Sequence, residues 1–244
     1  MGCVAVIGPA TIDCVVQGGE GVYKRGGVVT YAGLTFAELG VLTRVLTNVA
    51  ADDRAMLGLL RQRGIEVHVG ESPATTRFVN YVDGDARRQE LPFCAAPIAA
   101  AQLEPVLMGV DHVHLGPLQP DDIAAEAIAV IGDDCRVSLD IQGYVRRIEG
   151  ERVCRGVAGD LYAALRRADY VKASSDELEL VLEHAELTLE QLMADCAIAE
   201  WVITEGSRGG WVVDRVGQRT DFTSDSVSEV VDPTGAGDVF FAAY

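Results

Sequence analysis

The segment VVDPTGAGDVFFAAY, residues 230–244, is the most informative stretch of this sequence. Pro233 and the two glycines that follow predict a tight turn, and the apolar run after Asp238 predicts the start of a helix. The preceding residues 226–231, SVSEVV, are typical of a strand. A strand, a tight turn and a helix in this order are one unit of a parallel α/β sheet.

This turn has the chemistry of an anion site. The free N–H groups and the dipole of a helix N-terminus attract anions, and Gly235 and Gly237 allow a ligand to approach the backbone closely. Asp238 would then lie at the mouth of the site, where its carboxylate can accept a proton from a hydroxyl. Such an arrangement suits phosphoryl transfer to an alcohol. The same pattern also occurs as an ordinary helix cap. No GxxxxGK[ST] motif is present, which excludes a P-loop NTPase.

Working outward, buried strands alternate with amphipathic helices along the chain. We predict strands at 3–8, 41–49, 65–70, 111–116, 136–143, 169–174 and 200–213, the last interrupted by a glycine-rich turn. We predict helices at 30–40, 52–64, 120–132, 159–168, 175–185 and 188–196. This alternation indicates an α/β fold with a mainly parallel sheet covered by helices on both faces.

Two stretches, 12–27 and 75–91, break this rhythm. Each alternates apolar and polar residues around a glycine or Asp-Gly turn, the second at 83–85, and each predicts an antiparallel hairpin. Inserted without a helix between them, these strands, within 13–25 and 75–91, are expected to form a small β lid over a site. Residues 1–244 are expected to form a single domain.

Composition narrows the possible partners and location. Hydrophobic residues make up 49% of the 244 residues, but no apolar run is long enough to cross a bilayer. The formal net charge of −17 argues against nucleic acids and anionic membranes as partners. Six cysteines without a CxxC pair indicate reduced thiols and a cytoplasmic protein. Only Lys24 and Lys172 are lysines, which we attribute to genome composition.

Four segments together resemble the signatures of one family, the ribokinase-like (PfkB) carbohydrate kinases. These segments are DPTGAGDVFFAAY (232–244), GGVVTYAGLTFAELG (26–40), VKASSDEL (171–178) and TEGSRGG (204–210), in family order. The resemblance implies the ribokinase-like three-layer α/β/α fold. It also implies a kinase that uses ATP and Mg²⁺, with a monovalent cation such as K⁺ as a further candidate cofactor. Relatives often dimerise through their lids, which suggests a homodimer.

The resemblance also implies roles for individual residues. Asp238 would be the catalytic base, with the N–H groups of Gly235, Ala236 and Gly237 forming the anion hole. The other implied site residues are the nucleotide-side Thr204, Gly206 and Gly209, the magnesium-linked Glu177, and the substrate-side Asp13, Gly26 and Gly27. Considered alone, Asp13 is equally a strand-edge aspartate and Glu177 a solvated acid at a helix start.

Departures from the family pattern bear on the substrate. The Asn found after the glycine pair in ribokinases is absent, and Ser174 replaces the Asn of the KPNEEE segment, which puts the usual magnesium-water contact in doubt. The segment SLDIQGYVRR (138–147) is more similar to the myo-inositol kinase-like branch. Gln142 and Arg146 are therefore candidates for substrate contacts, although Arg146 could equally lie on the surface at a helix start.

The sequence thus predicts a kinase that phosphorylates a hydroxyl of a small sugar or polyol. A nucleoside kinase of the same family remains an alternative, with Phe78 and Tyr81 available for a base. A non-catalytic, ligand-sensing paralogue is a third possibility. Relatives continue for several elements after the catalytic helix, so we expect that the sequence is truncated after Tyr244 and lacks the elements that form one wall of the adenine pocket.

Overall fold

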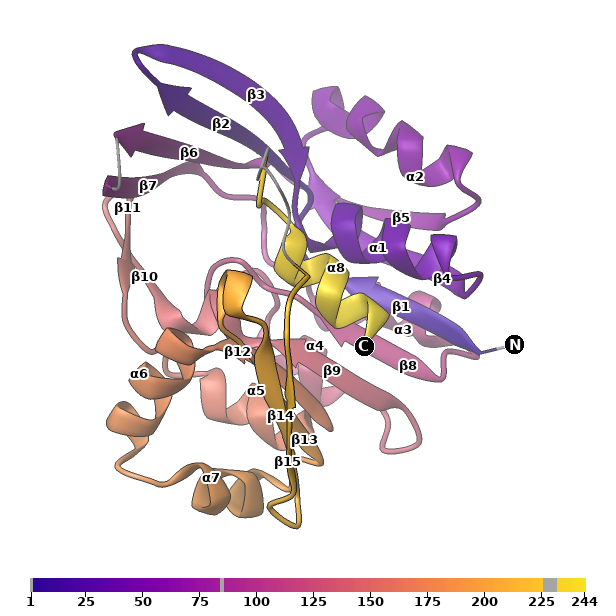
Figure 1. Cartoon of the computed structure of the whole chain (residues 1–244). Helices are drawn as coiled ribbons and strands as arrows, with labels where there is room; N and C mark the ends of the chain where they lie inside the picture. The colour runs from indigo at the N-terminus through magenta and orange to yellow at the C-terminus, as the bar shows by residue number, and fades with distance from the viewer. Residues whose placement is uncertain (1, 84–85, 226–231) are drawn as a thin grey trace.

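A large, mostly parallel sheet forms the centre of the computed structural model, which describes residues 2–83, 86–225 and 232–244 (Figure 1). Its strand order is β15-β14-β13-β12-β9-β8-β1-β4-β5. The strands are β1 (Cys3–Ile7), β4 (Leu42–Val49), β5 (Glu66–Glu71), β8 (His112–Leu115), β9 (Arg136–Asp140), β12 (Tyr170–Ser174), β13 (Glu200–Thr204), β14 (Gly210–Asp214) and β15 (Arg219–Phe222). In the described sheet, β14 pairs antiparallel with both β13 and β15, and the other pairings are parallel. All the strands predicted for this sheet within the described residues are confirmed; β15 was not predicted.

Helices cover both faces of this sheet. One layer contains α1 (Val28–Glu38), η1 (Ala51–Leu57), α2 (Gly58–Gln62) and α8 (Ala236–Ala243). The other contains α3 (Ala100–Leu107), α4 (Ala125–Ala129), α5 (Leu161–Arg167), α6 (Ser175–Ala185) and α7 (Leu189–Cys196). Strand β1 shows why both faces are covered. Val6 packs against the layer that contains α1, whereas Ala5 and Ile7 pack against the layer that contains α3, because successive side chains of a strand face opposite sides. The predicted three-layer α/β/α fold is confirmed.

A second, six-stranded sheet stands beside the first. Its order is β10-β11-β7-β6-β2-β3, from β2 (Thr11–Gln17), β3 (Glu20–Gly26), β6 (Thr76–Asp83), β7 (Ala86–Phe93), β10 (Arg146–Glu149) and β11 (Arg152–Arg155). Both predicted hairpins are antiparallel, and β2 joins them by pairing parallel with β6. The sequence analysis missed β10 and β11, which enlarge the predicted lid. Residues 84–85 of the expected turn and the strand expected at 226–231 lie outside the described residues.

Two predicted helices are shorter than expected. The helix expected at 120–132 spans only α4, because the Asp122 carboxylate accepts the N–H groups of Leu118 and Gln119 and closes a turn instead. The helix expected at 52–64 is divided into η1 and α2. Helix α3, which contains Pro105, was not predicted. No helix in the described part of the chain has both the length and the apolar character that crossing a membrane requires.

Gly27, at the junction of β3 and α1, provides a test of this backbone. Its φ of 88° is left-handed, and a Cβ there would lie 2.1 Å from the carbonyl oxygen of Pro9. Gly18 also has a left-handed φ, of 59°, but open space around it. We expect Gly18→Ala to lower the free energy of unfolding by about 1–2 kcal/mol through backbone strain alone. Gly27→Ala should lower the free energy of unfolding by about 1–3 kcal/mol more than Gly18→Ala does, because the new Cβ also clashes with the Pro9 carbonyl. Urea denaturation measures both, and equal losses would contradict this account.

Candidate active site

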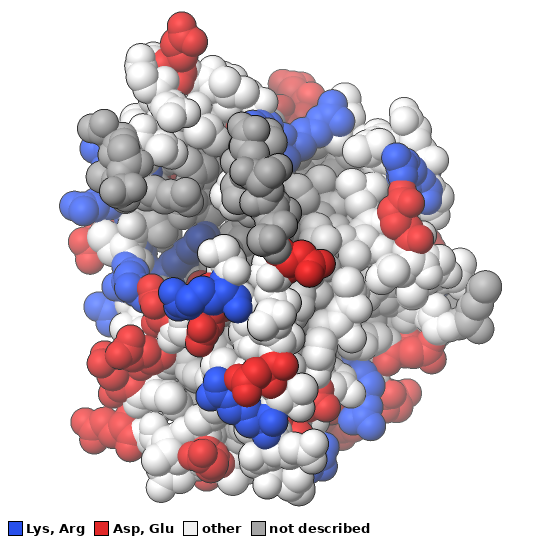
Figure 2. All heavy atoms as spheres, viewed as in Figure 1, with Lys and Arg blue, Asp and Glu red and all other residues white. Residues whose placement is uncertain are grey.

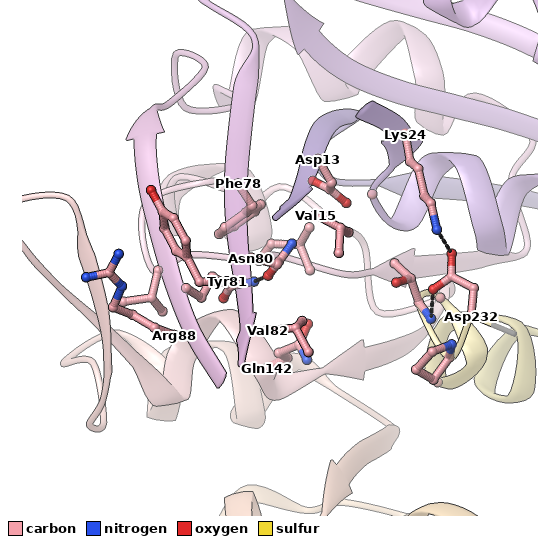
Figure 3. A pocket seen from close by; sticks show the side chains of 18 of the residues that line it. Asp13, Val15, Lys24, Phe78, Asn80, Tyr81, Val82, Arg88, Gln142 and Asp232 are labelled. Carbon is pink, nitrogen blue, oxygen red and sulfur yellow. Dashed lines mark hydrogen bonds and ion pairs between the residues drawn. The ribbon is translucent and has the colours of Figure 1, made fainter. Parts of the chain in front are cut away.

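A cleft of ≈ 1320 Å³ lies between the two sheets. One wall comes from the carboxyl ends of β9 and β12 and from the start of α8, and the other from the second sheet. Because parallel strands end at the same edge, the loops that follow them converge there. Figure 2 shows that basic and acidic side chains are mixed around this hollow. Figure 3 shows side chains from both walls in the cleft.

The start of α8 forms the tight turn and helix start expected from the sequence. Gly235 has φ 78° and precedes the first helical residue. The N–H of Ala236 donates to the Pro233 carbonyl at 3.2 Å, so it is already engaged. Among the described residues, the N–H groups of Gly235, Gly237 and Asp238 have no protein acceptor. Of the three groups assigned to the anion hole, those of Gly235 and Gly237 are therefore free to bind an anion, and that of Ala236 is not.

Asp238 lies on the first turn of α8 and lines the cleft. Burial raises the pKa of its carboxyl to about 7, and the negative charge of Asp140 acts in the same direction. Lys172 and Arg146 partly oppose this rise. A carboxylate whose pKa is close to neutral is well suited to accept a proton at physiological pH.

A buried ion pair underlies this turn. Lys172 on β12 donates to the Asp140 carboxylate at the end of β9, over 2.7 Å, and both side chains are nearly inaccessible to solvent. Burial alone would lower the pKa of Lys172, but Asp140 and Glu177 outweigh it and raise the pKa. A Cβ at Gly237 would lie 3.0 Å from the Lys172 ammonium. The turn therefore has a permanent positive charge directly against it.

The opposite wall of the cleft presents hydrogen-bonding groups from the second sheet. Asp13 on β2 is buried, which raises the pKa of its carboxyl, and within the described residues its Oδ1 has no hydrogen-bond partner. Asn80 on β6 accepts a bond from Gln89 on β7 at 2.7 Å. Apolar side chains lie between these polar groups, namely Val15, Val22, Phe78 and Val82. This wall suits a ligand that has both hydroxyl groups and C–H surfaces.

Arg146 and Gln142 also line the cleft, as expected from the sequence. Arg146 begins β10, donates to the Leu118 carbonyl at 2.8 Å and stacks over the Phe78 ring at 5.6 Å. It is partly buried, and burial lowers the pKa of its guanidinium. The alternative of a surface residue at a helix start is therefore wrong.

The expected nucleotide-side residues lie elsewhere. Thr204 ends β13, Gly206 begins the short helix η3 (Gly206–Arg208) and Gly209 follows it; none of them lines the cleft in the described structure. Glu177 lies on the first turn of α6, where its carboxylate accepts the Ser174 N–H at 2.8 Å in a capping box. The nucleotide-binding role of the first three residues stays a prediction.

Magnesium was predicted at Glu177. Within residues 2–83, 86–225 and 232–244, no group of three or more His, Cys, Asp or Glu side chains is arranged to hold a metal ion. The Glu177 carboxylate is also engaged in the helix cap. A magnesium ion at this site would therefore draw most of its oxygen ligands from bound phosphates and water, as this ion commonly does.

Several cleft residues were not assigned a role from the sequence. They are Lys24, Tyr31, Asn80, Gln89, Asp140, Lys172 and Asp232. Both lysines of the chain lie in this one cleft, so attributing them to composition overlooked their chemistry. Their rarity in a chain that otherwise uses Arg was the signal that could have identified them.

Comparison with known proteins agrees with this geometry. The model of the pfkB family of carbohydrate kinases matches residues 3–244. The chain belongs to this family. Among solved structures, a pyrophosphate-dependent kinase of the ribokinase family, in a sulfate complex, is 28% identical with a TM-score of 0.84, covering 98% of this chain and 85% of that one.

Two further structures extend the comparison. A pyrophosphate-dependent myo-inositol-1 kinase, converted into a myo-inositol-3 kinase by two substitutions, is 26% identical, with a TM-score of 0.81 over 98% of this chain and 83% of that one. Ribokinase from Thermotoga maritima shares the fold at 19% identity, with a TM-score of 0.76 over 100% of this chain and 84% of that one. The family and the relative at 28% identity make this pfkB-family chain a phosphotransferase that acts on a sugar or polyol.

The raised pKa of Asp238 has a consequence for stability. A carboxyl whose pKa rises from 3.8 to about 7 on folding destabilises the native state increasingly as pH rises through this window. Asp238→Asn removes this cost. We expect its gain in unfolding free energy over the wild type to be larger at pH 8 than at pH 5, by about 1–2 kcal/mol after allowance for solvent screening. Urea denaturation at the two pH values measures the difference; a gain independent of pH would contradict the assignment.

Proposed function

We propose that this protein is a polyol kinase that transfers a phosphoryl group to one hydroxyl of a small cyclic polyol of the myo-inositol type. Asp238 accepts the proton of the attacking hydroxyl. The free N–H groups of Gly235 and Gly237, with the adjacent Lys172, stabilise the negative charge of the transferring group.

The position of Asp238 carries this proposal. Its carboxyl, with a pKa of about 7, lies at one end of the cleft, on the same helix turn as the free N–H groups. The buried carboxylate of Asp13, whose Oδ1 has no hydrogen-bond partner among the described residues, lines the same cleft from the other wall. A hydroxyl compound bound at Asp13 would extend toward the base, as transfer to an alcohol requires.

The cleft wall favours a neutral polyol over a nucleoside. Carboxylate and amide groups, from Asp13, Asn80 and Gln142, can pair with several hydroxyls. The two aromatic rings available for a base are partly engaged: Arg146 stacks over Phe78, and Arg88 lies 4.2 Å from the centre of the Tyr81 ring. The family's myo-inositol kinase supports the same acceptor class.

The donor is a phosphoanhydride, which presents a terminal phosphoryl group to the turn. The sequence resemblance implied ATP, and one structure of this fold, at 19% identity, holds ATP. The relatives at 26–28% identity use pyrophosphate. They favour pyrophosphate as the donor of this protein, with ATP as the alternative. In the described part of the chain, Thr204, Gly206 and Gly209 do not line the cleft, which fits a donor without a nucleoside.

Other properties stay predictions from the sequence. They are a single domain spanning residues 1–244, a cytoplasmic location, activation by K⁺, and a homodimer formed through the second sheet. Edge strand β3 of that sheet exposes Val22 and Tyr23 and is the surface that such a dimer would use.

An Asp238→Asn variant tests the assignment and separates an enzyme from a ligand-sensing paralogue. We expect phosphorylation of myo-inositol to fall about 10²–10⁴-fold, because the general base is lost. Binding of myo-inositol should stay within a few-fold of the wild type. Phosphate transfer from pyrophosphate and from ATP is measured in parallel, with calorimetry for acceptor binding. Asp195→Asn, at an exposed position on α7, is the matched control. Unchanged turnover in Asp238→Asn would contradict the catalytic role of Asp238. A wild-type protein that binds the polyol without transferring phosphate would instead be a ligand sensor.

The pKa of Asp238 also predicts the pH dependence of catalysis. The base acts only when ionised, so kcat/KM should fall about tenfold per unit of pH below about 7 and level off above it. The profile is recorded with both donors, since pyrophosphate and ATP ionise differently. A fall in kcat/KM that occurs at the same pH with both donors reflects the ionisation of a group of the protein. A profile that is flat from pH 5 to 8 would contradict the role of Asp238 as the base.

A further inference from the structure

A salt bridge joins the second sheet to the anion-binding turn. Lys24 on β3 donates to Oδ2 of Asp232 over 2.7 Å, although the two residues are 208 positions apart (Figure 3). The other oxygen of Asp232, Oδ1, accepts the Thr234 N–H at 3.0 Å. One carboxylate therefore holds the turn on one side and the second sheet on the other. The Lys24 bond helps to hold the pKa of Asp232 at about 2, so this carboxylate stays ionised throughout the neutral range.

A second contact lies beside the first. The ring of Tyr31, on α1, lies against Gly235: a Cβ at this glycine would be 2.4 Å from the ring Cγ. The Tyr31 hydroxyl donates to the carbonyl of Arg25 on β3 at 3.3 Å. The ring thus supports the turn, while its hydroxyl contacts the second sheet.

The same segment borders the acceptor side of the cleft. Lys24 is the cross-strand neighbour of Asp13 in the β2–β3 pairing. A Cβ at Gly26 would lie 2.3 Å from Oδ2 of Asp13, so this backbone lies directly against the carboxylate. A molecule held by Asp13 would fix residues 24–31 in place. Those residues in turn contact Asp232 and Gly235.

We infer that Lys24 and Tyr31 are positioning residues that couple acceptor binding to the donor site, an inference that rests on the proposed kinase function. An acceptor bound at Asp13 holds β2 and β3 against the cleft. Lys24 and Tyr31 then hold the turn in the shape that presents the N–H groups of Gly235 and Gly237. Because coupling between sites is reciprocal, the donor also strengthens acceptor binding.

The nature of the two contacts fits this role. The Lys24 and Asp232 side chains are 39% and 32% exposed, and an ion pair of this kind contributes little to stability. It can therefore break and re-form as the second sheet moves. Such coupling completes the anion site only when a hydroxyl is ready to react, which limits transfer to water.

Four variants test the coupling in pairs. Lys24→Met removes the charge and Lys24→Arg keeps it, while Tyr31→Leu removes the ring and Tyr31→Phe keeps it. Tyr162→Phe, on α5 and outside the cleft, is the control. Calorimetry gives the Kd of methylenediphosphonate and of β,γ-methylene-ATP, each with and without saturating myo-inositol. Phosphate transfer to myo-inositol is assayed alongside.

In the wild type and the control we expect myo-inositol to tighten binding of the donor analogue on the order of tenfold. Lys24→Met and Tyr31→Leu should reduce this factor to less than about twofold. The affinity for myo-inositol in the absence of the donor analogue should not fall by a similar amount. The Arg and Phe variants should retain most of it. Since Lys24 is half-exposed, Lys24→Met is not expected to unfold the protein. If Tyr31→Leu does not fold, Lys24→Met alone tests the coupling.

Two failures are distinguishable. Suppose that the wild type phosphorylates myo-inositol but binds the donor analogue equally well with and without myo-inositol. This result would overturn the coupling and leave the kinase function intact. A Lys24→Met variant that retains the full tenfold factor would do the same. A wild type that transfers phosphate from neither donor would overturn the proposed function and, with it, the coupling.

Discussion

The buried pair between Lys172 and Asp140 is the interaction on which the active site depends. Two strands that are adjacent in the sheet, β9 and β12, place these side chains 2.7 Å apart, where water cannot screen them. Removing one partner of such a pair typically costs about 3–5 kcal/mol, because the other charge is left buried and unpaired. The pair therefore fixes a positive charge against Gly237, and the first turn of α8 is built over it.

The same local electrostatics explain how Asp238 can be a base. Its carboxyl is held between opposing influences: burial and Asp140 disfavour its charge, whereas Lys172 and Arg146 favour it. Full neutralisation by the two cations would lower its basicity, and their absence would keep it protonated at neutral pH. The position of the ion pair thus influences both the proton affinity of Asp238 and the charge against the turn at Gly237.

Much of the fold could be predicted because it depends on local pattern. Apolar runs such as residues 3–7 are buried on both faces, and the segment around Asp238 combines a turn, two glycines and a helix start in sequence. The predictions that failed depend on polar contacts, local or tertiary, that the spacing of apolar residues does not record. The carboxylate of Asp122 closes a turn where helical spacing favoured a helix, and β10 and β11 are rich in Arg and Glu, so no alternation of apolar residues revealed them. Likewise, Asp140 and Lys172 are 32 residues apart, and only the order of the strands brings them together.

The hairpin of β2 and β3 has two ends with very different freedom. At the end beside α1, Gly26 and Gly27 are packed against Asp13 and Pro9, so a larger side chain has no room there. At its tip, a Cβ added to Gly18 or Gly19 would meet no atom within 4 Å. Side chains or insertions at the tip can therefore be accommodated without a clash, whereas the end beside α1 accepts neither. Sequence change in this hairpin should accordingly concentrate at the tip, where it alters one wall of the cleft and leaves Asp13 in place.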